Sequence, residues 1–403
     1  MKLTLQDIQR AERNIKGFIR KTPLEKSHTI TEMIGQPVYF KYENLQKTGS
    51  FKLRGAANKI INLWEEGKTK GVIAASAGNH AQGVAFAATR LGIKAKILMP
   101  KGAPITKISA TEGYGAEVIL EGNTYDDCYN YAIYLAEKEN LTYVHAFDDP
   151  QVIAGQGTIG LEILEQLPSV KNVIVPIGGG GLMAGVLLAI KESNPNVRVI
   201  GVQASGAAAM VQSIKSGLLS ATAHVNTIAD GIAVKKPGEL TYSIIKNYID
   251  DIVTVEEEEI SRAILLLLER SKTVVEGAGA TTVASLIYSK VPDIKGETVT
   301  VLSGGNIDPT TISTLIERGM VKAGRKTFIE VVLQDCPGQL QKLLEVIAAN
   351  EANVIAVNHD RLSPHIPIKH AKVNLTLETR DLNHGKKILE KLKSLNYDCK
   401  ISE

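Results

Sequence analysis

The sequence predicts an α/β protein built on parallel sheets, followed by a small module of mixed helices and strands. Short runs rich in Val and Ile alternate with helical patterns through about the first three quarters of the 403 residues. Strands that are apolar nearly throughout and separated by helices are typical of parallel sheets covered on both faces. Three of these runs end in small or glycine-rich turns, 76-SAGN-79, 178-GGGGL-182 and 303-SGGN-306. In open α/β sheets, ligands bind beyond such strand ends.

The first part of the chain contains six expected strands, with helical patterns between them. The strands are expected at 71–76, 95–100, 117–122, 173–178, 197–204 and 298–305. The clearest helices are expected at 80–92, 125–140 and 181–193. A parallel connection needs a crossover of this length, so the alternation itself favours parallel pairing.

The character of the sequence changes at the short basic stretch 322-KAGRK-326, which predicts a linker. We therefore expect one domain at 1–322, a linker at 323–326 and a second domain at 327–403. The second domain has expected elements in the order strand, helix, strand, strand, helix, strand, at 327–335, 336–353, 353–363, 371–379, 383–395 and 397–402. This βαββαβ order predicts a ferredoxin-like domain, which is small for an independently stable unit.

The composition excludes several classes of protein. The net charge of +3, from 46 basic and 43 acidic residues, gives no electrostatic reason to expect a nucleic-acid or membrane partner. Cys128, Cys336 and Cys399 are far apart and lack a C-x-x-C spacing, which argues against disulfides or zinc. The N-terminus lacks a signal-peptide core, and apolar runs such as 263-AILLLL-268 are too short to span a bilayer. We expect a cytoplasmic protein.

The stretch 48-TGSFKLRGA-56 places Lys52 in an apolar, glycine-flanked setting. Most lysines are solvated, so a turn with an exposed lysine is one interpretation. The other is a nucleophilic lysine that burial keeps partly uncharged, with Phe51 beside it to pack against a flat cofactor.

The stretch 76-SAGNHAQG-83 lies at a strand-to-helix junction. Ser76 or Asn79 is suited to cap the helix. The free amides of the same turn also form an anion site that fits a carboxylate. Both interpretations predict a helix that starts close to His80.

Two further turns follow strands. The stretch 178-GGGGL-182 lacks the pattern of a dinucleotide fingerprint and the Gly-Lys-Ser/Thr of a P-loop. Four glycines at a helix start can nevertheless wrap one phosphate with backbone amides. Ser303, at the end of the strand TVTVL, either caps a turn or offers one hydrogen bond to a heterocycle.

Together, a reactive lysine, a carboxylate site, a phosphate cup and a strand-end serine describe pyridoxal phosphate holding an amino acid. The sequence resembles the fold-type II pyridoxal-phosphate enzymes, and among them the serine/threonine dehydratases, the threonine-specific ones most. The motifs that carry this resemblance occur in the family's order: 50-SFKLRGA-56, 75-ASAGNHAQGVA-85, 178-GGGGL-182, 229-ADGIAV-234, 275-VEGAGA-280 and 302-LSGGNID-308. It implies two open parallel-sheet subdomains, the smaller at roughly 47–150, with the cofactor between them.

The resemblance also implies roles for individual residues. Lys52 is the covalent anchor of the cofactor and the catalytic base, and Phe51 lies against the cofactor ring. Asn79 bonds the phenolic oxygen of the cofactor and Ser303 its pyridine nitrogen. The remaining cofactor contacts come from Gly178, Gly179, Gly180, Gly181 and Leu182, which bind the phosphate, and from Gly231 and Glu276. The substrate carboxylate is surrounded by Ser76, Ala77, Gly78 and His80.

The implied activity is elimination of water from L-threonine, and from L-serine, to give 2-oxobutanoate or pyruvate and ammonia. A serine-preferring dehydratase, a racemase-like enzyme and a non-catalytic amino-acid sensor are the alternatives. Racemases of the family carry a second serine where this chain has Ala77, and the intact Lys52 argues against a sensor. Gln203 and Ala209 stand where metal-binding members have carboxylates, so no bound magnesium is expected, and a monovalent ion held by carbonyl oxygens stays open.

The tail motif 335-DCPGQL-340 resembles an ACT domain, a small regulatory module that binds amino acids. Candidate contacts to an amino-acid or nucleotide effector are Asp335, Gly338, Leu340 and Asn353. A dimerisation module without a ligand is the alternative. The resemblance implies a homodimer or homotetramer with a role in isoleucine biosynthesis or threonine catabolism.

Overall fold

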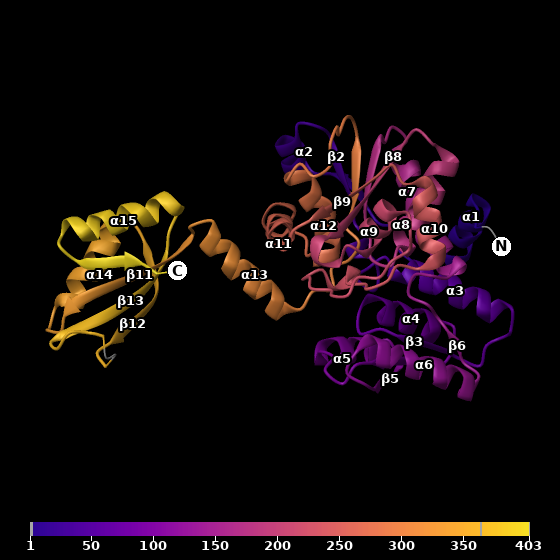
Figure 1. Cartoon of the computed structure of the whole chain (residues 1–403), viewed down its shortest axis with the longest axis horizontal. Coiled ribbons are helices and arrows are strands. Elements are labelled where there is room, and N and C mark those ends of the chain that lie inside the picture. The colour runs from indigo at the N-terminus through magenta and orange to yellow at the C-terminus, as the bar shows by residue number, and fades with distance from the viewer. Residues whose placement is uncertain (1–2, 363–364, 403) are drawn as a thin grey trace. The chain divides into compact units, whose positions relative to one another are not determined.

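The computed structural model describes residues 3–362 and 365–402, and its contacts divide the chain into two compact units between Asp308 and Pro309. Each unit is described by itself. The first holds two sheets with their helices, and the second holds one sheet with helices (Figure 1).

The larger sheet of the first unit has six strands in the order β1-β2-β10-β7-β8-β9. Its neighbours pair in parallel except for β1, which is antiparallel to β2. The strands are β1 Leu24–Lys26, β2 Val38–Lys41, β7 Asn172–Pro176, β8 Arg198–Ala204, β9 Asp251–Val255 and β10 Thr298–Val301. Every residue of β7 and β10 is buried, as expected for inner strands of a sheet that is covered on both faces.

The smaller sheet has four parallel strands in the order β5-β4-β3-β6. They are β3 Val72–Ala75, β4 Ala95–Met99, β5 Glu117–Leu120 and β6 Thr142–Tyr143. The prediction of two parallel sheets in the first part of the chain is therefore confirmed.

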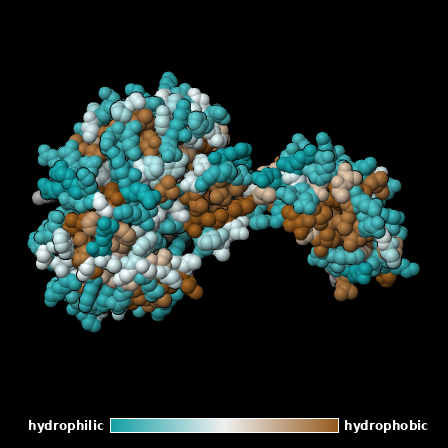
Figure 2. Space-filling model, turned by 180° about the vertical axis from the view of Figure 1, so that it is seen from behind, coloured by the Kyte–Doolittle hydropathy of each residue, from teal (hydrophilic) through white to brown (hydrophobic). Residues whose placement is uncertain are grey.

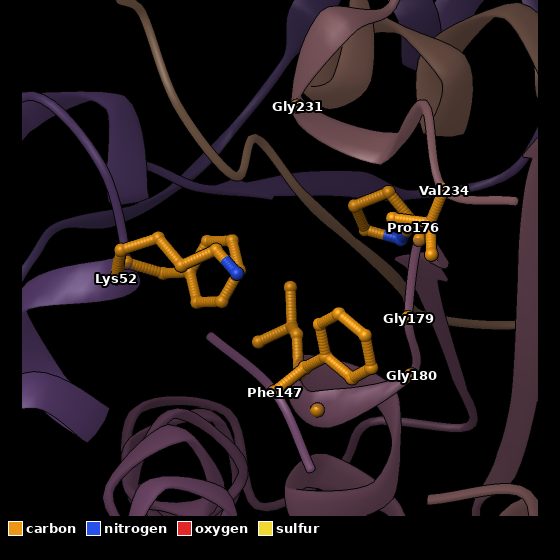
Figure 3. A pocket seen from close by; sticks show the side chains of 11 residues that line it. Lys52, Phe147, Pro176, Gly179, Gly180, Gly231 and Val234 are labelled. Carbon is orange, nitrogen blue, oxygen red and sulfur yellow. The ribbon is translucent and has the colours of Figure 1, made fainter. Parts of the chain in front are cut away.

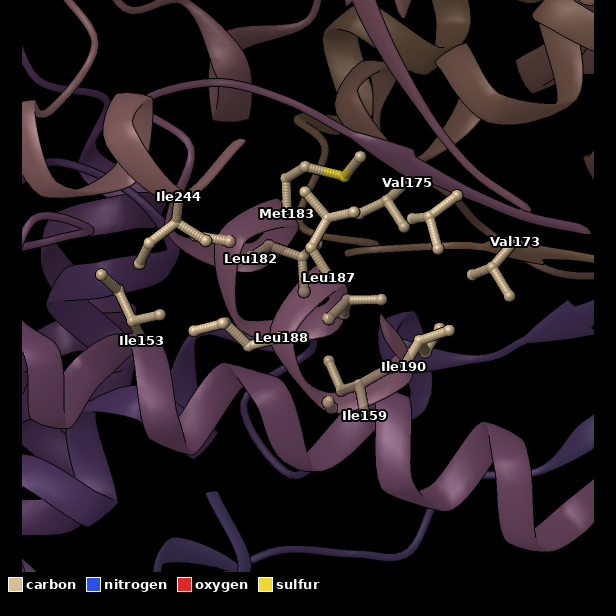
Figure 4. Close-up of a cluster of buried hydrophobic side chains, with 14 of the residues drawn as sticks. Ile153, Ile159, Val173, Val175, Leu182, Met183, Leu187, Leu188, Ile190 and Ile244 are labelled. Atoms are coloured by element: carbon tan, nitrogen blue, oxygen red, sulfur yellow. The ribbon is translucent and has the colours of Figure 1, made fainter. Parts of the chain in front are cut away.

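Helices connect and cover these strands. They are α1 Leu5–Ile15, α2 His28–Ile34, α3 Lys52–Glu65, α4 Asn79–Arg90, α5 Ile105–Gly113, α6 Tyr125–Glu139, α7 Pro150–Gln166, α8 Gly181–Ser193, α9 Ala209–Ser216, α10 Glu239–Tyr248, α11 Glu257–Leu266 and α12 Gly277–Ile287. Helix α8 is apolar all round and lies in the main core, against α7, α10 and β7 (Figure 4). This packing holds the turn between β7 and α8 firmly in place.

The second unit begins with α13, Pro309–Lys322, and continues as a βαββαβ arrangement. Its elements are β11 Lys326–Gln334, α14 Gln339–Ala349, β12 Asn353–Asp360, β13 His370–Glu378, α15 Leu382–Ser394 and β14 Asp398–Ile401. They form an antiparallel sheet in the order β12-β13-β11-β14, as the ferredoxin-like prediction requires. Ser363, the last residue of an expected strand, lies outside the described residues.

One expected helix starts later than the sequence pattern indicates. The pattern places its start at Cys336, but α14 begins at Gln339. Gly338 adopts a left-handed backbone conformation with φ of 86°, which a helix cannot include. The turn 335–338 is thus an exposed loop and not a first helical turn.

Candidate active site

A pocket in the first unit is lined from several elements at once (Figure 3). Lys52 comes from the start of α3, Phe147 from the segment after β6, and the glycines from the turn between β7 and α8. The lining residues are Phe51, Lys52, Phe147, Pro176, Gly178, Gly179, Gly180, Gly181, Leu182, Gly231 and Val234. The structure therefore brings the predicted lysine and the predicted phosphate cup to one cavity.

Lys52 is the first residue of α3, and its side chain is held in the pocket. Its Nζ donates a hydrogen bond to the carbonyl oxygen of Ala146 at 2.8 Å. Burial lowers the pKa of Lys52 to about 8, and the nearby carboxyl of Glu276 opposes this shift. About a tenth of the amine is consequently uncharged at pH 7, against far less for an ordinary lysine, and the uncharged amine is the nucleophilic form.

Ser303 is joined to the lysine segment through the backbone. The amide of Phe51 donates to the carbonyl oxygen of Ser303 at 3.0 Å, and Ser50 pairs with Gly304 in an isolated bridge. The Oγ of Ser303 is buried without a hydrogen-bond partner among the described residues. A buried hydroxyl without a partner carries an energetic penalty, so this atom fits a ligand heteroatom such as a ring nitrogen.

The glycines of this turn pack too closely against other parts of the chain to be replaced by any other residue. A Cβ on Gly179 would lie 2.5 Å from the ring of Phe147, and one on Gly180 would lie 2.8 Å from Thr241. Gly180 also has φ of 99° and stands at the N-cap of α8. A glycine turn that opens a buried helix directs backbone amides outward, as a phosphate requires. These features fit a bound pyridoxal phosphate.

Asn79 and Glu276 face each other from α4 and from the residue before α12. The Nδ2 of Asn79 lies 2.8 and 3.0 Å from the two carboxylate oxygens of Glu276. Burial raises the pKa of Glu276 to about 7, although the bond from Asn79 works against this shift. A Cβ on Gly231 would lie 2.9 Å from the same carboxylate, so Gly231 makes space for Glu276.

The predicted carboxylate site lies where α4 begins. Gly78 is the N-cap of α4, and its amide donates to Ser76 Oγ at 3.2 Å. The Nε2 of His80 lies 2.8 Å from the carbonyl oxygen of Val144, so this nitrogen carries the proton. Burial and the neighbouring Lys52 lower the pKa of His80 to about 3. A neutral ring in this tautomer has no N–H left for a carboxylate.

The segment 144–149 contains site residues that were not predicted from the sequence. Ala146 binds the lysine, Phe147 covers the glycine turn, and the carboxylate of Asp148 accepts from three amides at the start of α10. A signal was present in the sequence, because an aspartate followed by a proline is a helix-start pattern, and Asp149 caps α7, which begins with Pro150. Pro176 was also missed, since an apolar residue within a strand carries no chemical signal, and Val234 was quoted only as part of the motif 229-ADGIAV-234, without a role of its own.

Gln203 occupies the place where metal-binding relatives were expected to have a carboxylate. Its Nε2 donates to the carbonyl oxygen of Ile177 at 3.1 Å, and its Oε1 accepts from the amide of Val211 at 2.9 Å. Within residues 3–362 and 365–402, no group of three or more His, Cys, Asp or Glu side chains is arranged to hold a metal ion. The amide of Gln203 thus links the strand before the glycine turn to α9.

The predicted effector residues of the second unit do not all meet. Asp335 begins the turn after β11 and pairs with Arg361, and Gly338 follows in the same turn. Leu340 packs against the core of the unit. Asn353 pairs with Glu378 at the far end of β13, since Gln334 pairs with His370 at its near end. Within one chain, Asn353 is therefore at the opposite end of the sheet from Asp335.

Comparisons with known proteins agree with this geometry. Residues 15–304 match the family model of pyridoxal-phosphate-dependent enzymes, and residues 324–397 match an ACT domain. The L-threonine ammonia-lyase of Thermotoga maritima is 51% identical over 400 residues, which cover 99% of each chain.

Solved structures give the same fold. The processed threonine deaminase isoform 2 of Solanum lycopersicum has a TM-score of 0.74 and 40% identity, covering 78% of this chain and 92% of its own. Maize serine racemase has a TM-score of 0.75 and 33% identity, covering 80% of this chain and 99% of its own. No helix within the described parts of the chain has the length and apolarity needed to cross a membrane.

The predicted fold, cofactor class and C-terminal module are thus confirmed. The chain belongs to the fold-type II pyridoxal-phosphate-dependent enzymes and carries a C-terminal ACT domain.

Proposed function

We propose that this chain is a threonine ammonia-lyase, which converts L-threonine to 2-oxobutanoate and ammonia and accepts L-serine as a second substrate. The observation that carries the proposal is the placement of the Lys52 amine in one cavity with the glycine turn 178–181. The similarity to a threonine ammonia-lyase over almost the full length of both chains supports the choice of substrate.

The bound cofactor supplies a conjugated electron sink that acidifies the Cα–H of an attached amino acid and allows the β-hydroxyl to leave. Lys52 would anchor this group covalently and, as a free neutral amine, would be the base that removes the Cα proton. Its pKa of about 8 lets Nζ accept that proton near neutral pH and later release it. In the structure, the carbonyl oxygen of Ala146 accepts from Nζ and orients it.

Ser303 directs the outcome toward elimination. A neutral hydroxyl cannot keep a proton on a ring nitrogen as an aspartate does. The electron sink is weaker as a result, and loss of the β-substituent competes better against racemisation or transamination. The amides of residues 178–182 hold the phosphate, and those at the start of α4 receive the substrate carboxylate.

A racemase function is a second candidate because maize serine racemase has a similar fold. Racemisation needs an acid–base group on each face of the Cα atom. Lys52 supplies one face, but Ala77 has no side-chain proton to supply the other. The residue at this position therefore favours the lyase.

We further propose that the ACT domain regulates turnover by binding an amino acid, and that the chain works as a homodimer or homotetramer. The edge strand β12 exposes Ile355 and Val357 (50% and 40%). A broad apolar area is also visible on this unit in the space-filling view (Figure 2). The separation of Asp335 from Asn353 within one chain means that a site using both needs a second copy.

The test is turnover of the purified chain with pyridoxal phosphate on both substrates. We expect a visible absorption band from the bound cofactor and a higher kcat/KM for threonine than for serine. One methyl group is worth only about 1–3 kcal/mol, so the expected preference is roughly 10- to 200-fold at most. Lys52→Ala should lower kcat by at least about 10³-fold, while Lys47→Ala, in the same segment but bonded to Gly17, should not. A colourless chain that forms no 2-oxo acid would rule the proposal out. A higher kcat/KM for serine than for threonine would show that the chain is a serine-preferring dehydratase.

A further inference from the structure

A directional chain of hydrogen bonds fixes the orientation of the Asn79 side chain. The Asn306 side chain lies 2.9 Å from the carbonyl oxygen of Thr48, which only accepts, so the atom facing it is Nδ2. The same nitrogen lies 2.7 Å from the side chain of Asn79, which must therefore present Oδ1. Asn79 in turn directs Nδ2 toward Glu276. One hydrogen on this nitrogen is used by the carboxylate, and the second remains as a donor.

The place of the Glu276 carboxylate is built into the fold. The residue is only 7% exposed, and its backbone amide donates to the carbonyl oxygen of Gly304 at 3.0 Å. A Cβ on Gly304 would lie 2.6 Å from Oε1 of Glu276, and one on Gly231 would lie 2.9 Å from the same atom. The segments that contain Gly304 and Gly231 thus have no side chain where the Glu276 carboxylate packs against them, and the carboxylate is held against Asn79.

We propose that Glu276 is a positioning residue, which orients the Asn79 amide so that its remaining N–H is offered to the phenolic oxygen of the bound cofactor. This inference rests on the proposed function, because it assumes that Asn79 contacts the cofactor. Glu276 acts through Asn79 and not as a charge on the cofactor itself.

The two modes of action predict opposite effects on the bound cofactor. A hydrogen bond to the phenolic oxygen favours its ionised form, so loss of the donor raises the pH at which the cofactor–lysine linkage loses its proton. Loss of a nearby negative charge would lower that pH. The other charged groups that face Glu276 are Lys52, Lys107 and Asp230, and they stay unchanged in every variant below.

The experiment is a pH titration of the visible absorption of the full-length holoenzyme without substrate. The variants are Glu276→Ala, Glu276→Asp, Glu276→Gln, Asn79→Ala and the double variant Glu276→Ala/Asn79→Ala. The matched control is Glu259→Gln. Glu259 lies on α11, and its largely buried carboxylate pairs with Lys290.

The expected results follow from reach and hydrogen-bonding capacity. Asn79→Ala and Glu276→Ala should each raise the midpoint by about one pH unit, the equivalent of one hydrogen bond. The midpoint of the double variant should be no higher than that of either single variant, because both changes remove the same hydrogen-bond donor. Glu276→Asp keeps the negative charge, but its shorter side chain no longer reaches Asn79, so its midpoint should also rise. Glu276→Gln keeps an acceptor oxygen at the same reach and should stay close to the wild type.

Three results would overturn the inference. They are a midpoint that falls in Glu276→Ala, a double variant whose shift is the sum of the two single shifts, and a Glu276→Gln variant that behaves like Glu276→Ala. If Glu276→Ala does not fold, the comparison of the midpoints of Glu276→Asp and Glu276→Gln is sufficient: the midpoint should be raised in Glu276→Asp only, and equal midpoints would overturn the inference. A wild-type chain without a visible band would instead refute the proposed function, and this inference with it.

Discussion

Lys52 owes its reactivity to its surroundings in the folded chain. The sequence places it beside Phe51 and between glycines, but the lowered pKa comes from burial. The hydrogen bond to Ala146 comes from a segment that lies 94 residues away in the sequence. The motif therefore identifies the residue, whereas only the fold shows how its charge is controlled.

The lowered pKa of Lys52 has a measurable consequence for binding of pyridoxal phosphate to the apoprotein. Only the neutral amine attacks the aldehyde, so the rate should rise about tenfold per pH unit below pH 8. Above pH 8 it should level off, because Lys52 is then mostly neutral. The measurement is the rate of appearance of the visible band in stopped-flow mixing. A rate that still climbs between pH 9 and pH 10 would show that Lys52 has the pKa of an ordinary lysine.

Motif residues were predictable from the sequence because each sits at a turn with a recognisable pattern. Lys52, the four glycines at 178–181 and Gly231 line one cavity, as expected. Phe147 could not be predicted, because it lies outside the motifs and lines the cavity only through contacts between distant segments. The neutral state of His80 also depends on a distant partner, Val144, and on burial.

At the scale of elements, a buried ion network ties α3 to α7. The guanidinium of Arg54 bonds Glu43 at 2.8 Å and Glu162 at 2.7 Å, and Lys41 also pairs with Glu162. Arg54, Glu43 and Lys41 are fully buried. Helix α3 begins with Lys52, and α7 follows the segment that holds the lysine amine, so the network sets the spacing of the two elements on which Lys52 depends.

Removing Arg54 leaves the buried carboxylate of Glu43 without its cationic partner and leaves Glu162 paired with Lys41 alone. We expect Arg54→Met to lower the free energy of unfolding of the first unit by about 3–5 kcal/mol. Lys21→Met, which breaks the exposed pair between Lys21 and Glu165 on the same helix α7, should change it by less than about 1 kcal/mol. Urea unfolding followed by circular dichroism measures both. Equal, small losses in the two variants would mean that the network does not anchor these helices.

The elements of the chain could be predicted to different degrees. Apolar strands such as β7 and the buried helix α8 have patterns that depend on local burial, and their bounds are close to those expected. The start of α14 was misplaced because the left-handed conformation of Gly338 is set by the turn. The short antiparallel strand β1 was not expected, since three residues are too few to show the alternation of apolar and polar side chains that identifies a strand.

At the scale of the whole molecule, the chain combines a catalytic unit with an ACT domain. The contacts separate the units between Asp308 and Pro309, so α13 belongs to the second unit. The sequence pattern placed the change at 322–326, because α13 is a regular amphipathic helix and its composition does not differ from that of the helices before it. The linker at 323–326 stays a prediction.

Regulation through the ACT domain predicts that an amino acid alters turnover without entering the active site. We expect isoleucine, valine or a nucleotide to change kcat/KM for threonine by at least about fivefold, the lower end of allosteric coupling. Gly338→Val should remove the response and leave basal turnover intact, because Gly338 lies in the turn at φ of 86°. Lys386→Ala, an exposed position on α15, is the control and should respond normally. No response to any of these ligands would leave the unit with a purely structural role.

We propose that Lys52 alone anchors pyridoxal phosphate. The most direct test is to reduce the full-length holoenzyme with borohydride, digest it with trypsin and locate the added cofactor mass by mass spectrometry. We expect one modified residue, Lys52, and loss of 2-oxobutanoate formation in parallel with the modification. Cofactor mass on another lysine, such as the buried Lys41, or no added mass at all, would contradict it.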